Sequence, residues 1–331
     1  MKALEQEVLT RAHAFIARHA RTDEQRRLLS DAVQHVAAPA RQTGSASREL
    51  ACIELPLAVY QGMRGVAAPA VPLAVASLLL CAGMDLLDDL MDGDAGALWS
   101  AFGPAELMLA ATTLLTALPP LVLVELDAPP TTVIELQRTV AQAEMVLSAG
   151  QQRDVLFAES EAVRAEAVEA VAAAKSGEAY AMFASLAAIL AGATSEDIDH
   201  VAAFGRALGT AQQLRSDFYD LFLAPRSKDL TNGTRTLPVA LGLQGLAGIE
   251  RDLFVELLRR ARTDQSAVEQ VRTCLRDSGI LTACAVVIDL YAHRARDEVT
   301  RVTLLEPGEA ALLRLADAAV FWPRSKHSKL P

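Results

Sequence analysis

Hydrophobic residues recur along this chain with the three- to four-residue spacing of amphipathic helices, and short breaks interrupt the pattern. The breaks contain glycine, proline or small polar residues, which end helices or start them. They fall at residues 38–47, 65–72, 92–103, 119–130, 193–196, 224–236, 262–264 and 306–308. Residues 194–197 and Ser30-Asp31 offer side chains that can cap helices. The pattern predicts roughly ten to twelve helices.

The connections between these helices are short, and the sequence has no long linker, low-complexity tract or repeat of fixed period. We therefore expect residues 1–331 to form a single all-α domain, one large helical bundle. The composition supports this expectation, because alanine, leucine, glutamate and arginine are abundant and aromatic residues make up only 5%.

The formal net charge of −10 argues against nucleic acid as a partner, because nucleic-acid-binding domains usually carry a basic patch. The basic residues that do cluster lie in the tail, residues 323–331. We interpret this tail as a solvated end, with a flap over an anionic substrate as the alternative. The four cysteines are scattered without a CxxC pair, so neither a zinc site nor a disulfide framework is expected.

The most apolar stretch, residues 66–84, contains two prolines and ends among aspartates. A buried core helix therefore explains it better than a membrane span. The first seven residues have the pattern of an amphipathic helix and not of a signal peptide. We expect a cytoplasmic protein without a membrane span.

Four aspartates follow this apolar run, and their spacing of i, i+3, i+4 and i+7 puts them on one helix face. They are Asp85, Asp88, Asp89 and Asp92. Their mutual repulsion is relieved by a divalent cation, and Mg²⁺ favours carboxylate oxygens together with substrate phosphates. The alternative is an acidic helix end, which the helix macrodipole disfavours.

A second polar face with the same spacing comes later in the chain. It consists of Gln213, Ser216, Asp217 and Asp220. Gly205 and Gly209 precede it, four residues apart, and would allow close helix packing. Two carboxylate-bearing helices that face each other can hold a diphosphate through shared cations.

Lys175 is one of only five lysines and occurs in a mostly apolar helix, where an unpaired ammonium is costly. We interpret it as a phosphate ligand. A surface position, or an ion pair with Glu178, is the alternative.

Together these segments resemble the trans-isoprenyl diphosphate synthase (polyprenyl synthetase) family, over roughly residues 48–300 and in the family's order. Asp88-Asp89-Leu90-Met91-Asp92 matches its DDxxD motif, and Gly150-Gln151-Gln152-Arg153-Asp154 is similar to its GQxxD segment. Lys175-Ser176-Gly177 resembles its lysine-containing segment. Residues 209–220 resemble its second aspartate-rich motif, and residues 229–238 resemble the DLxxGKxTLP segment.

The resemblance implies the class I isoprenoid synthase fold and site residues with defined roles. Metal ligands are expected at Asp88, Asp92, Asp217, Asp220 and Ser216, holding Mg²⁺ ions, three in number, against an allylic prenyl diphosphate. Lys175, Lys228 and Arg235 are expected to bind the diphosphate, and Asp85, Asp89, Gln151 and Gln213 to orient the ligands. Gly83 and Met84 are candidates for shaping the pocket of the prenyl tail, with helix packing as the alternative. A homodimer is expected by analogy with the family.

The departures from the family pattern decide between activities. The early basic segment that binds isopentenyl diphosphate is reduced to Arg48, and Glu54-Leu55-Pro56 follows it. No lysine or arginine occurs between Arg64 and Arg138. Ser216 replaces the first aspartate of the second motif, and Thr234 replaces the family's lysine. The sequence therefore favours a terpene synthase that ionises and cyclises one allylic diphosphate.

Three alternatives stay open. A chain-elongating prenyl diphosphate synthase would bind isopentenyl diphosphate through arginines that the motifs do not identify. A prenyltransferase would use another acceptor, such as a peptide side chain. A non-catalytic partner subunit is disfavoured because the first aspartate motif is complete.

Overall fold

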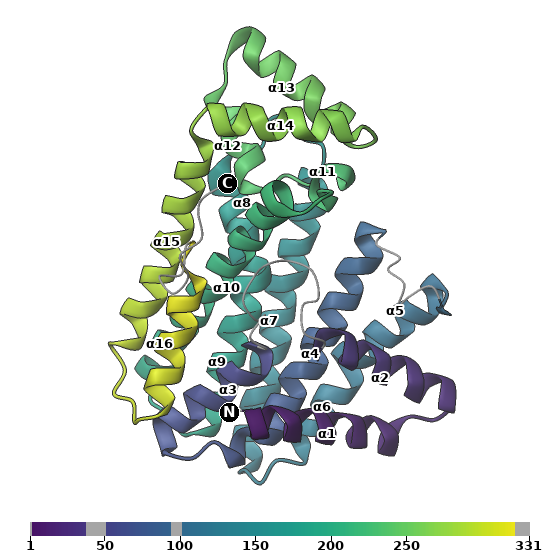
Figure 1. The fold of residues 1–331 in the computed structure, drawn as a ribbon. Coiled ribbons are helices and arrows are strands. Elements are labelled where there is room, and N and C mark those ends of the chain that lie inside the picture. Colours follow the sequence, from purple (N-terminus) through teal and green to yellow (C-terminus); the bar gives the residue numbers. More distant parts are fainter. Residues whose placement is uncertain (1, 38–50, 94–100, 322–331) are drawn as a thin grey trace. The chain divides into compact units, whose positions relative to one another are not determined.

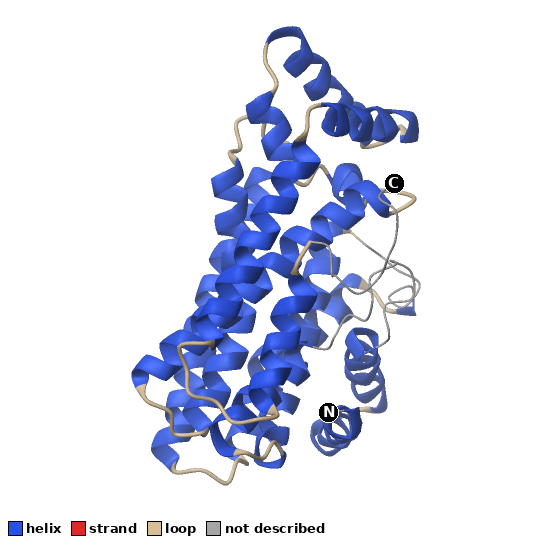
Figure 2. Ribbon diagram, turned by 60° about the vertical axis from the view of Figure 1, so that its left-hand side comes forward, coloured by secondary structure: helices blue, strands red, loops and turns tan. Residues whose placement is uncertain are grey.

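The structure is a computed structural model that describes residues 2–37, 51–93 and 101–321. These residues form helices and connecting segments, with no strand among them, which confirms the all-α class (Figures 1 and 2). Arg48, the basic tail and residues 94–100 lie outside the described ranges. By its internal contacts the chain divides into two compact units, which we call unit 1 and unit 2.

Unit 1 comprises residues 1–141, 182–201 and 302–312. Its helices in chain order are α1 (Lys2–His19), α2 (Asp23–Ala37), α3 (Ala51–Arg64), the short η1 (Ala68–Ala70), α4 (Val71–Asp92), α5 (Pro104–Thr112), the π-helical turn η3 (Thr113–Ala117) and α6 (Leu118–Val124).

Helix α4 is the central helix of unit 1, since α1, α2, α3, α5 and α6 all pack against it (Figure 1). Its first half is apolar on every side, and its side chains from Leu73 to Leu80 are buried. A helix that is hydrophobic all round belongs in a core, as the sequence predicts for this stretch. Removing these side chains from water supplies the main stabilisation of the unit, and it fixes the polar end of α4.

Unit 2 comprises residues 142–181, 202–301 and 313–331. Helices α7 (Pro130–Phe157), α9 (Glu178–Leu190), α10 (Ser195–Leu223) and α16 (Gly308–Ala319) each contain a boundary between the units. The elements wholly within unit 2 are α8 (Ala165–Ala172), the π-helical turn η4 (Ala173–Gly177), α11 (Lys228–Asn232), α12 (Leu237–Gly245), α13 (Gly248–Ala261), α14 (Gln265–Asp277) and α15 (Ile280–Val299).

The core of unit 2 forms where α12 packs against α8, α13 and α15. Phe254 and Leu275 are fully buried there, and α13 and α14 pack against each other. The aromatic rings of Phe218 and Phe222 on α10 join this core, with their ring centroids 4.6 Å apart. This packing fixes the C-terminal half of α10, which carries the second polar motif.

The helix boundaries follow the sequence pattern at several places and depart from it at others. Thr194 caps α10 as predicted, because its hydroxyl accepts a hydrogen bond from the Asp197 amide at 3.1 Å. The cap predicted at Ser30-Asp31 is wrong, since α2 runs through both residues. The break predicted from residue 119 begins six residues later, because Pro119 lies in the first turn of α6, where a missing amide hydrogen costs little.

Two helical stretches, residues 68–92 and 104–124, are long and apolar enough to cross a membrane. The most apolar window of the first is 72% buried within the protein, as expected for a core helix, and that of the second is 44% buried. The expectations of a cytoplasmic protein without a span, and of a single domain, stay predictions.

Candidate functional site

The first aspartate motif lies in the last two turns of α4, in unit 1. The side chains of Asp85, Asp88 and Asp89 are half-buried and that of Asp92 is exposed. The helix ends at Asp92, and Gly93, with a φ of +66°, closes the final turn because its amide donates to the carbonyl oxygens of Asp89 and Leu90. The register predicted from the spacing is therefore present, and all four carboxylates lie toward one side of the helix.

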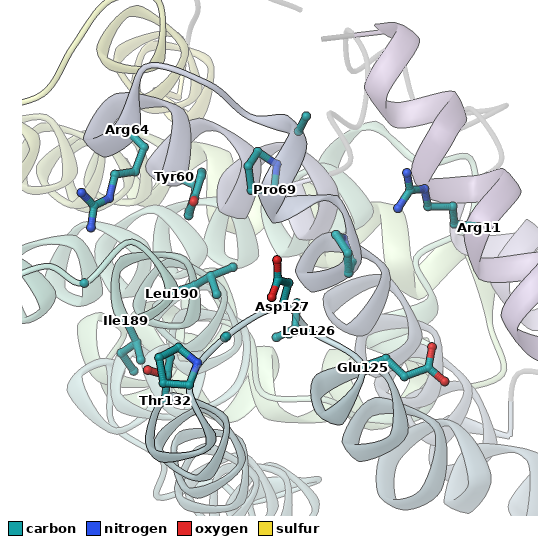
Figure 3. A pocket seen from close by; sticks show the side chains of 15 residues that line it. Arg11, Tyr60, Arg64, Pro69, Glu125, Leu126, Asp127, Thr132, Ile189 and Leu190 are labelled. Atoms are coloured by element: carbon teal, nitrogen blue, oxygen red, sulfur yellow. The ribbon is translucent and has the colours of Figure 1, made fainter.

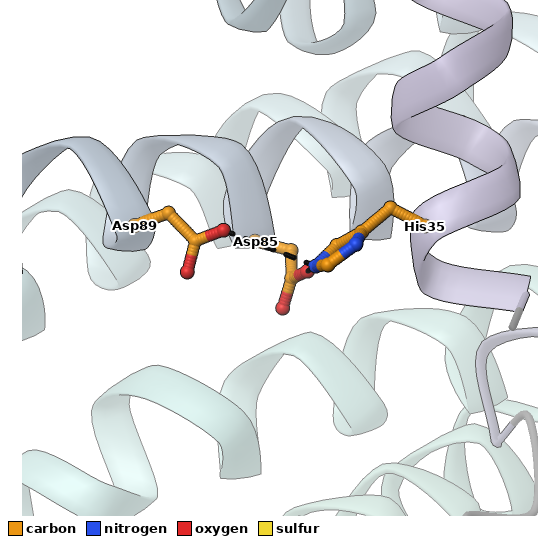
Figure 4. Close-up of side chains that lie close together, drawn as sticks. All are labelled: His35, Asp85 and Asp89. Carbon is orange, nitrogen blue, oxygen red and sulfur yellow. Dashed lines mark ion pairs between the residues drawn. The ribbon is translucent and has the colours of Figure 1, made fainter. Parts of the chain in front are cut away.

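His35 on α2 approaches this side of α4 and was not predicted as part of the site. Its Nε2 lies 3.8 Å from Asp85 Oδ2 and 4.0 Å from Asp89 Oδ2 (Figure 4). Its sequence position gives no signal of this contact, because only the packing of α2 on α4 brings the residues together.

The residues expected to shape the tail pocket lie one turn before the motif. A Cβ atom on Gly83 would come within 2.7 Å of Leu115 Cγ, so the missing side chain accommodates the packing of α4 on η3. Met84 is half-buried. Helix packing therefore explains Gly83, and a pocket role for either residue stays a prediction.

The second polar motif lies on α10, in unit 2, and Gln213 and Asp217 of this motif share a chain of hydrogen bonds with Ser176 of η4. The amide nitrogen of Gln213 donates to Asp217 Oδ1 at 2.8 Å, and the Ser176 hydroxyl donates to Gln213 Oε1 at 2.5 Å. Ser216 on the same helix is exposed. Gln213 thus holds the Asp217 carboxylate in one orientation, as expected of a residue that positions a metal ligand.

Asp220 is fixed by a different set of donors. The buried Ser227 hydroxyl donates to its Oδ2 at 2.6 Å, and the backbone amides of Lys228 and Asp229 donate to its two oxygens at 3.1 Å each. The carboxylate therefore caps the start of α11. Ser227 was missed from the sequence, although its position just before a short helix is typical of an N-cap.

Lys175 lies in η4, where a π-helical turn interrupts the helix, and π-turns of this kind are frequent at functional sites. Its Nζ lies 2.5 Å from Asp154 Oδ2, and both side chains are mostly buried. The alternative partner predicted for it, Glu178, instead accepts from Arg206. Asp154 was not predicted as a site residue, yet it is the last residue of the GQxxD-like segment, which is the signal that identifies it.

The electrostatics of this cluster centre on Asp217. Burial, together with the neighbouring carboxylates of Asp154 and Asp220, raises the pKa of Asp217 to about 7, against the hydrogen bond from Gln213 and the charge of Lys175. A carboxylate surrounded by other carboxylates favours a bound cation, which would remove the repulsion. The donor set is thus well suited to Mg²⁺.

The glycines predicted to allow close packing are confirmed in that role. A Cβ atom on Gly205 would lie 2.4 Å from the carbonyl oxygen of Tyr180, and one on Gly209 would lie 2.2 Å from that of Ser176. Backbone therefore meets backbone where α10 crosses η4 and α9. The contact brings Lys175 and Ser176 to the polar face of α10.

Of the remaining candidates, Arg235 and Lys228 come after α10 in the chain, and Gln151 lies on α7. Arg235 is buried, and its guanidinium donates to the carbonyl oxygens of Ser160 and Gly233 at 2.6 Å and 3.0 Å. Burial lowers the pKa of Arg235. Lys228 is exposed, and Gln151 is half-buried on α7, three residues before Asp154.

Unit 2 therefore brings together Lys175, Gln213, Asp217 and Asp220, and unit 1 carries the first aspartate motif. That the two groups act on one substrate stays a prediction. A separate hollow of about 570 Å³ lies in unit 1 at the start of α4, lined by Tyr60, Arg64 and Asp127 among others (Figure 3). It belongs to the end of α4 away from Asp88.

Comparisons with known proteins agree with the family resemblance of the motifs. The chain is 27% identical over 192 residues to nonaprenyl diphosphate synthase of Mycobacterium tuberculosis, covering 56% of this chain and 57% of that protein. It is 26% identical over 184 residues to geranylfarnesyl diphosphate synthase of Aeropyrum pernix, covering 54% of this chain and 57% of that protein. The chain thus matches somewhat more than half the length of these relatives.

A crystal structure of geranylgeranyl pyrophosphate synthase from Corynebacterium glutamicum, complexed with isoprenyl diphosphate and magnesium, has the same fold. Its TM-score is 0.80 at 18% identity, covering 96% of this chain and 98% of that one. The isoprenoid synthase fold predicted from the motifs is thereby confirmed. The sequence model of the polyprenyl synthetase family matches residues 27–275, and the chain belongs to this family.

Proposed function

We propose that this protein is a Mg²⁺-dependent prenyltransferase that removes diphosphate from an allylic prenyl diphosphate and joins the prenyl group to isopentenyl diphosphate. The observation that carries the proposal is the Asp154–Lys175–Asp217 cluster on α7, η4 and α10. It combines a mostly buried ammonium with a carboxyl group whose pKa is raised to about 7. Such a cluster gains stability when cations and a diphosphate bind together.

Bound Mg²⁺ would supply Lewis-acid chemistry, neutralising the charge that develops on the leaving diphosphate. Asp88 and Asp92 on α4, and Asp217 and Asp220 on α10 with Ser216, would hold the ions. We propose three ions, the number that the family resemblance implies. The fixed orientation of Asp217 and Asp220 means that little reorganisation is needed when the charge develops.

Lys175 would contact the leaving diphosphate directly. Before substrate binds, its ion pair with Asp154 holds the ammonium near the polar face of α10. Arg235 and Lys228 would add positive charge from the loop after α10. Gln151, Gln213 and Asp89 would orient the ligands through hydrogen bonds.

The names of the two curated relatives support chain elongation over the cyclisation that the sequence analysis favoured. Both relatives are named as synthases of prenyl diphosphates. Cyclisation by a terpene synthase is the second candidate. It is favoured by the absence of lysine and arginine from residues 65–137, and by the buried acid Glu54 on α3. A homodimer, by analogy with the family, and a cytoplasmic location, as the sequence pattern indicates, are part of the proposal.

Diphosphate release from allylic substrates in the presence of Mg²⁺ tests the shared first step. Asp88→Asn and Asp217→Asn should each lower the rate by roughly 100-fold, the size typical of losing a group that stabilises transition-state charge. Asp317→Asn is the matched control, because this exposed carboxylate on α16 forms an ion pair with Arg296 on α15. Equal rates for all three variants would contradict the assignment.

A further inference from the structure

The four acids of α4 separate into two pairs with different surroundings. Asp85 and Asp89 are one turn apart, and so are Asp88 and Asp92. At about 100° per residue, the mean directions of the two pairs differ by about 60° around the helix axis. The first pair faces α2, from which His35 extends toward it (Figure 4).

Helix α2 fixes the position of this histidine through its own apolar face. Leu29, Ala32, Val33 and Val36 are buried, and α2 packs against α4. His35 lies between Val33 and Val36 in the sequence, and its side chain points to the acidic side of α4 (Figure 4). The contact is thus set by the packing of α2 on α4.

Three ligand atoms converge at this place. They are one imidazole nitrogen and one carboxylate oxygen from each of two aspartates, and all lie within 4.8 Å of one another. Ligands that share one ion sit about 2.0–2.2 Å from it, which puts neighbouring ligand atoms about 3–3.5 Å apart. The histidine-to-carboxylate distances of 3.8 Å and 4.0 Å need only a small contraction. All three side chains are partly exposed, between 27% and 38%, so they can turn to make it.

The donor set also indicates which ions fit. Mg²⁺ prefers oxygen ligands only, whereas one imidazole and two carboxylates suit Zn²⁺, Co²⁺ or Mn²⁺. Three protein ligands leave further coordination positions open to water or to a ligand. The pair Asp88 and Asp92, in contrast, offers carboxylates and suits Mg²⁺.

We infer that His35, Asp85 and Asp89 form a binding site for one divalent transition-metal ion, beside the Mg²⁺ ligands of the same helix and distinct from them. The inference goes beyond the proposed function, because the ion binds without a prenyl substrate. It gives the aspartate-rich end of α4 two metal sites of different selectivity.

The test uses full-length protein freed of metal with EDTA and then dialysed. CoCl₂ is added while the visible absorption of bound Co²⁺ is recorded, and ZnCl₂ binding is measured by calorimetry. One ion should bind through nitrogen and oxygen ligands. His35→Ala and Asp85→Asn should each weaken its affinity at least tenfold. Helical circular dichroism establishes that each variant is folded.

Two matched controls separate this site from its surroundings. His293→Ala removes an exposed histidine on α15 and should leave Co²⁺ and Zn²⁺ binding unchanged. Asp88→Asn alters the neighbouring pair and should leave Co²⁺ binding within twofold. A tenfold excess of MgCl₂ should not displace Co²⁺.

Either of two results overturns the inference. One is the absence of bound Co²⁺ and Zn²⁺, in which case the contacts of His35 with the two aspartates do not make a metal site. The other is Co²⁺ binding that persists in His35→Ala and is lost in Asp88→Asn, which would assign the ion to the Mg²⁺ ligands. Neither readout depends on prenyl diphosphate turnover, so the proposed function can fail while this inference stands.

Discussion

The contact between α10 and η4 at Gly209 can be tested by adding a single methyl group. A Cβ atom at this position would lie 2.2 Å from the Ser176 carbonyl oxygen, 2.7 Å from its carbonyl carbon and 3.0 Å from the Gly177 Cα. All three are backbone atoms, so no side chain can turn aside. The two helical segments would have to separate by about 1 Å to reach an ordinary contact, and overpacking of this kind costs about 1–3 kcal/mol.

Alanine has the opposite effect on the helix itself, since it favours a helix interior over glycine by about 1 kcal/mol. An approach of 2.2 Å to a backbone oxygen puts the overpacking at the upper end of its range, so we expect Gly209→Ala to lower the free energy of unfolding by about 2 kcal/mol. Gly245→Ala is the matched control, because a Cβ atom there meets nothing within 4 Å. It should leave stability unchanged or raise it slightly.

Urea denaturation followed by circular dichroism measures both variants through the midpoint at constant slope. Diphosphate release should fall in Gly209→Ala as well, because the displaced segment carries Lys175 and Ser176. If the free energies of unfolding of Gly209→Ala and Gly245→Ala differed by less than about 0.5 kcal/mol, residue 209 would behave like a surface position, and the close contact would be refuted.

Three further predictions concern the charged groups. The raised pKa of Asp217 means that the folded, metal-free protein holds this proton more tightly than the unfolded chain does. Stability in EDTA should therefore fall as the pH rises from about 4 to about 7. Asp217→Asn should flatten this dependence and raise stability at pH 8 by about 1–2 kcal/mol, the full shift being reduced for partial solvent exposure. If the stability of the variant fell with pH as steeply as that of the wild type, the assignment to Asp217 would be wrong. Lys175→Met should lower diphosphate release by roughly 100-fold, whereas Arg296→Ala, which breaks an exposed ion pair, should not; equal rates would remove Lys175 from the site. EDTA should abolish diphosphate release and added Mg²⁺ should restore it, and turnover that persists without metal would contradict the Mg²⁺ assignment.

The helical periodicity and the acid spacing predicted the all-α class, the buried α4 and the acidic face at its end, because each depends on local register alone. The glycine spacing at 205 and 209 predicted close packing for the same reason. Identifying what these glycines approach, the backbone of Ser176 and Tyr180, required the folded structure.

The partners of the site residues were harder to predict because they come from other elements. The pairing of Lys175 with Asp154 joins η4 to α7, and the approach of His35 joins α2 to α4. Neither contact leaves a periodic signal. The π-helical turn at Lys175 is also invisible to a pattern of period 3.6, and it shifts the register of every residue after it.

The wrong prediction of a cap at Ser30-Asp31 has a different cause, because a local preference was followed where tertiary packing decides. Serine and aspartate favour helix starts by their local hydrogen bonds, yet the buried Leu29 and Val33 hold α2 together through these positions. Tertiary packing outweighs the local preference there. Residues 38–50, where the family's basic segment falls, lie outside the described ranges. The identity of the acceptor is therefore tested by analysing the products of the reaction.

Product analysis is the most direct test of the central claim. Purified protein is incubated with Mg²⁺ and allylic diphosphates of ten to twenty-five carbons, each with and without isopentenyl diphosphate. We predict longer prenyl diphosphates only when isopentenyl diphosphate is present, and loss of all products in Asp88→Asn. Hydrocarbon or alcohol products formed without isopentenyl diphosphate would contradict chain elongation and support the terpene synthase reaction instead. Intact substrate at every chain length would contradict the account altogether.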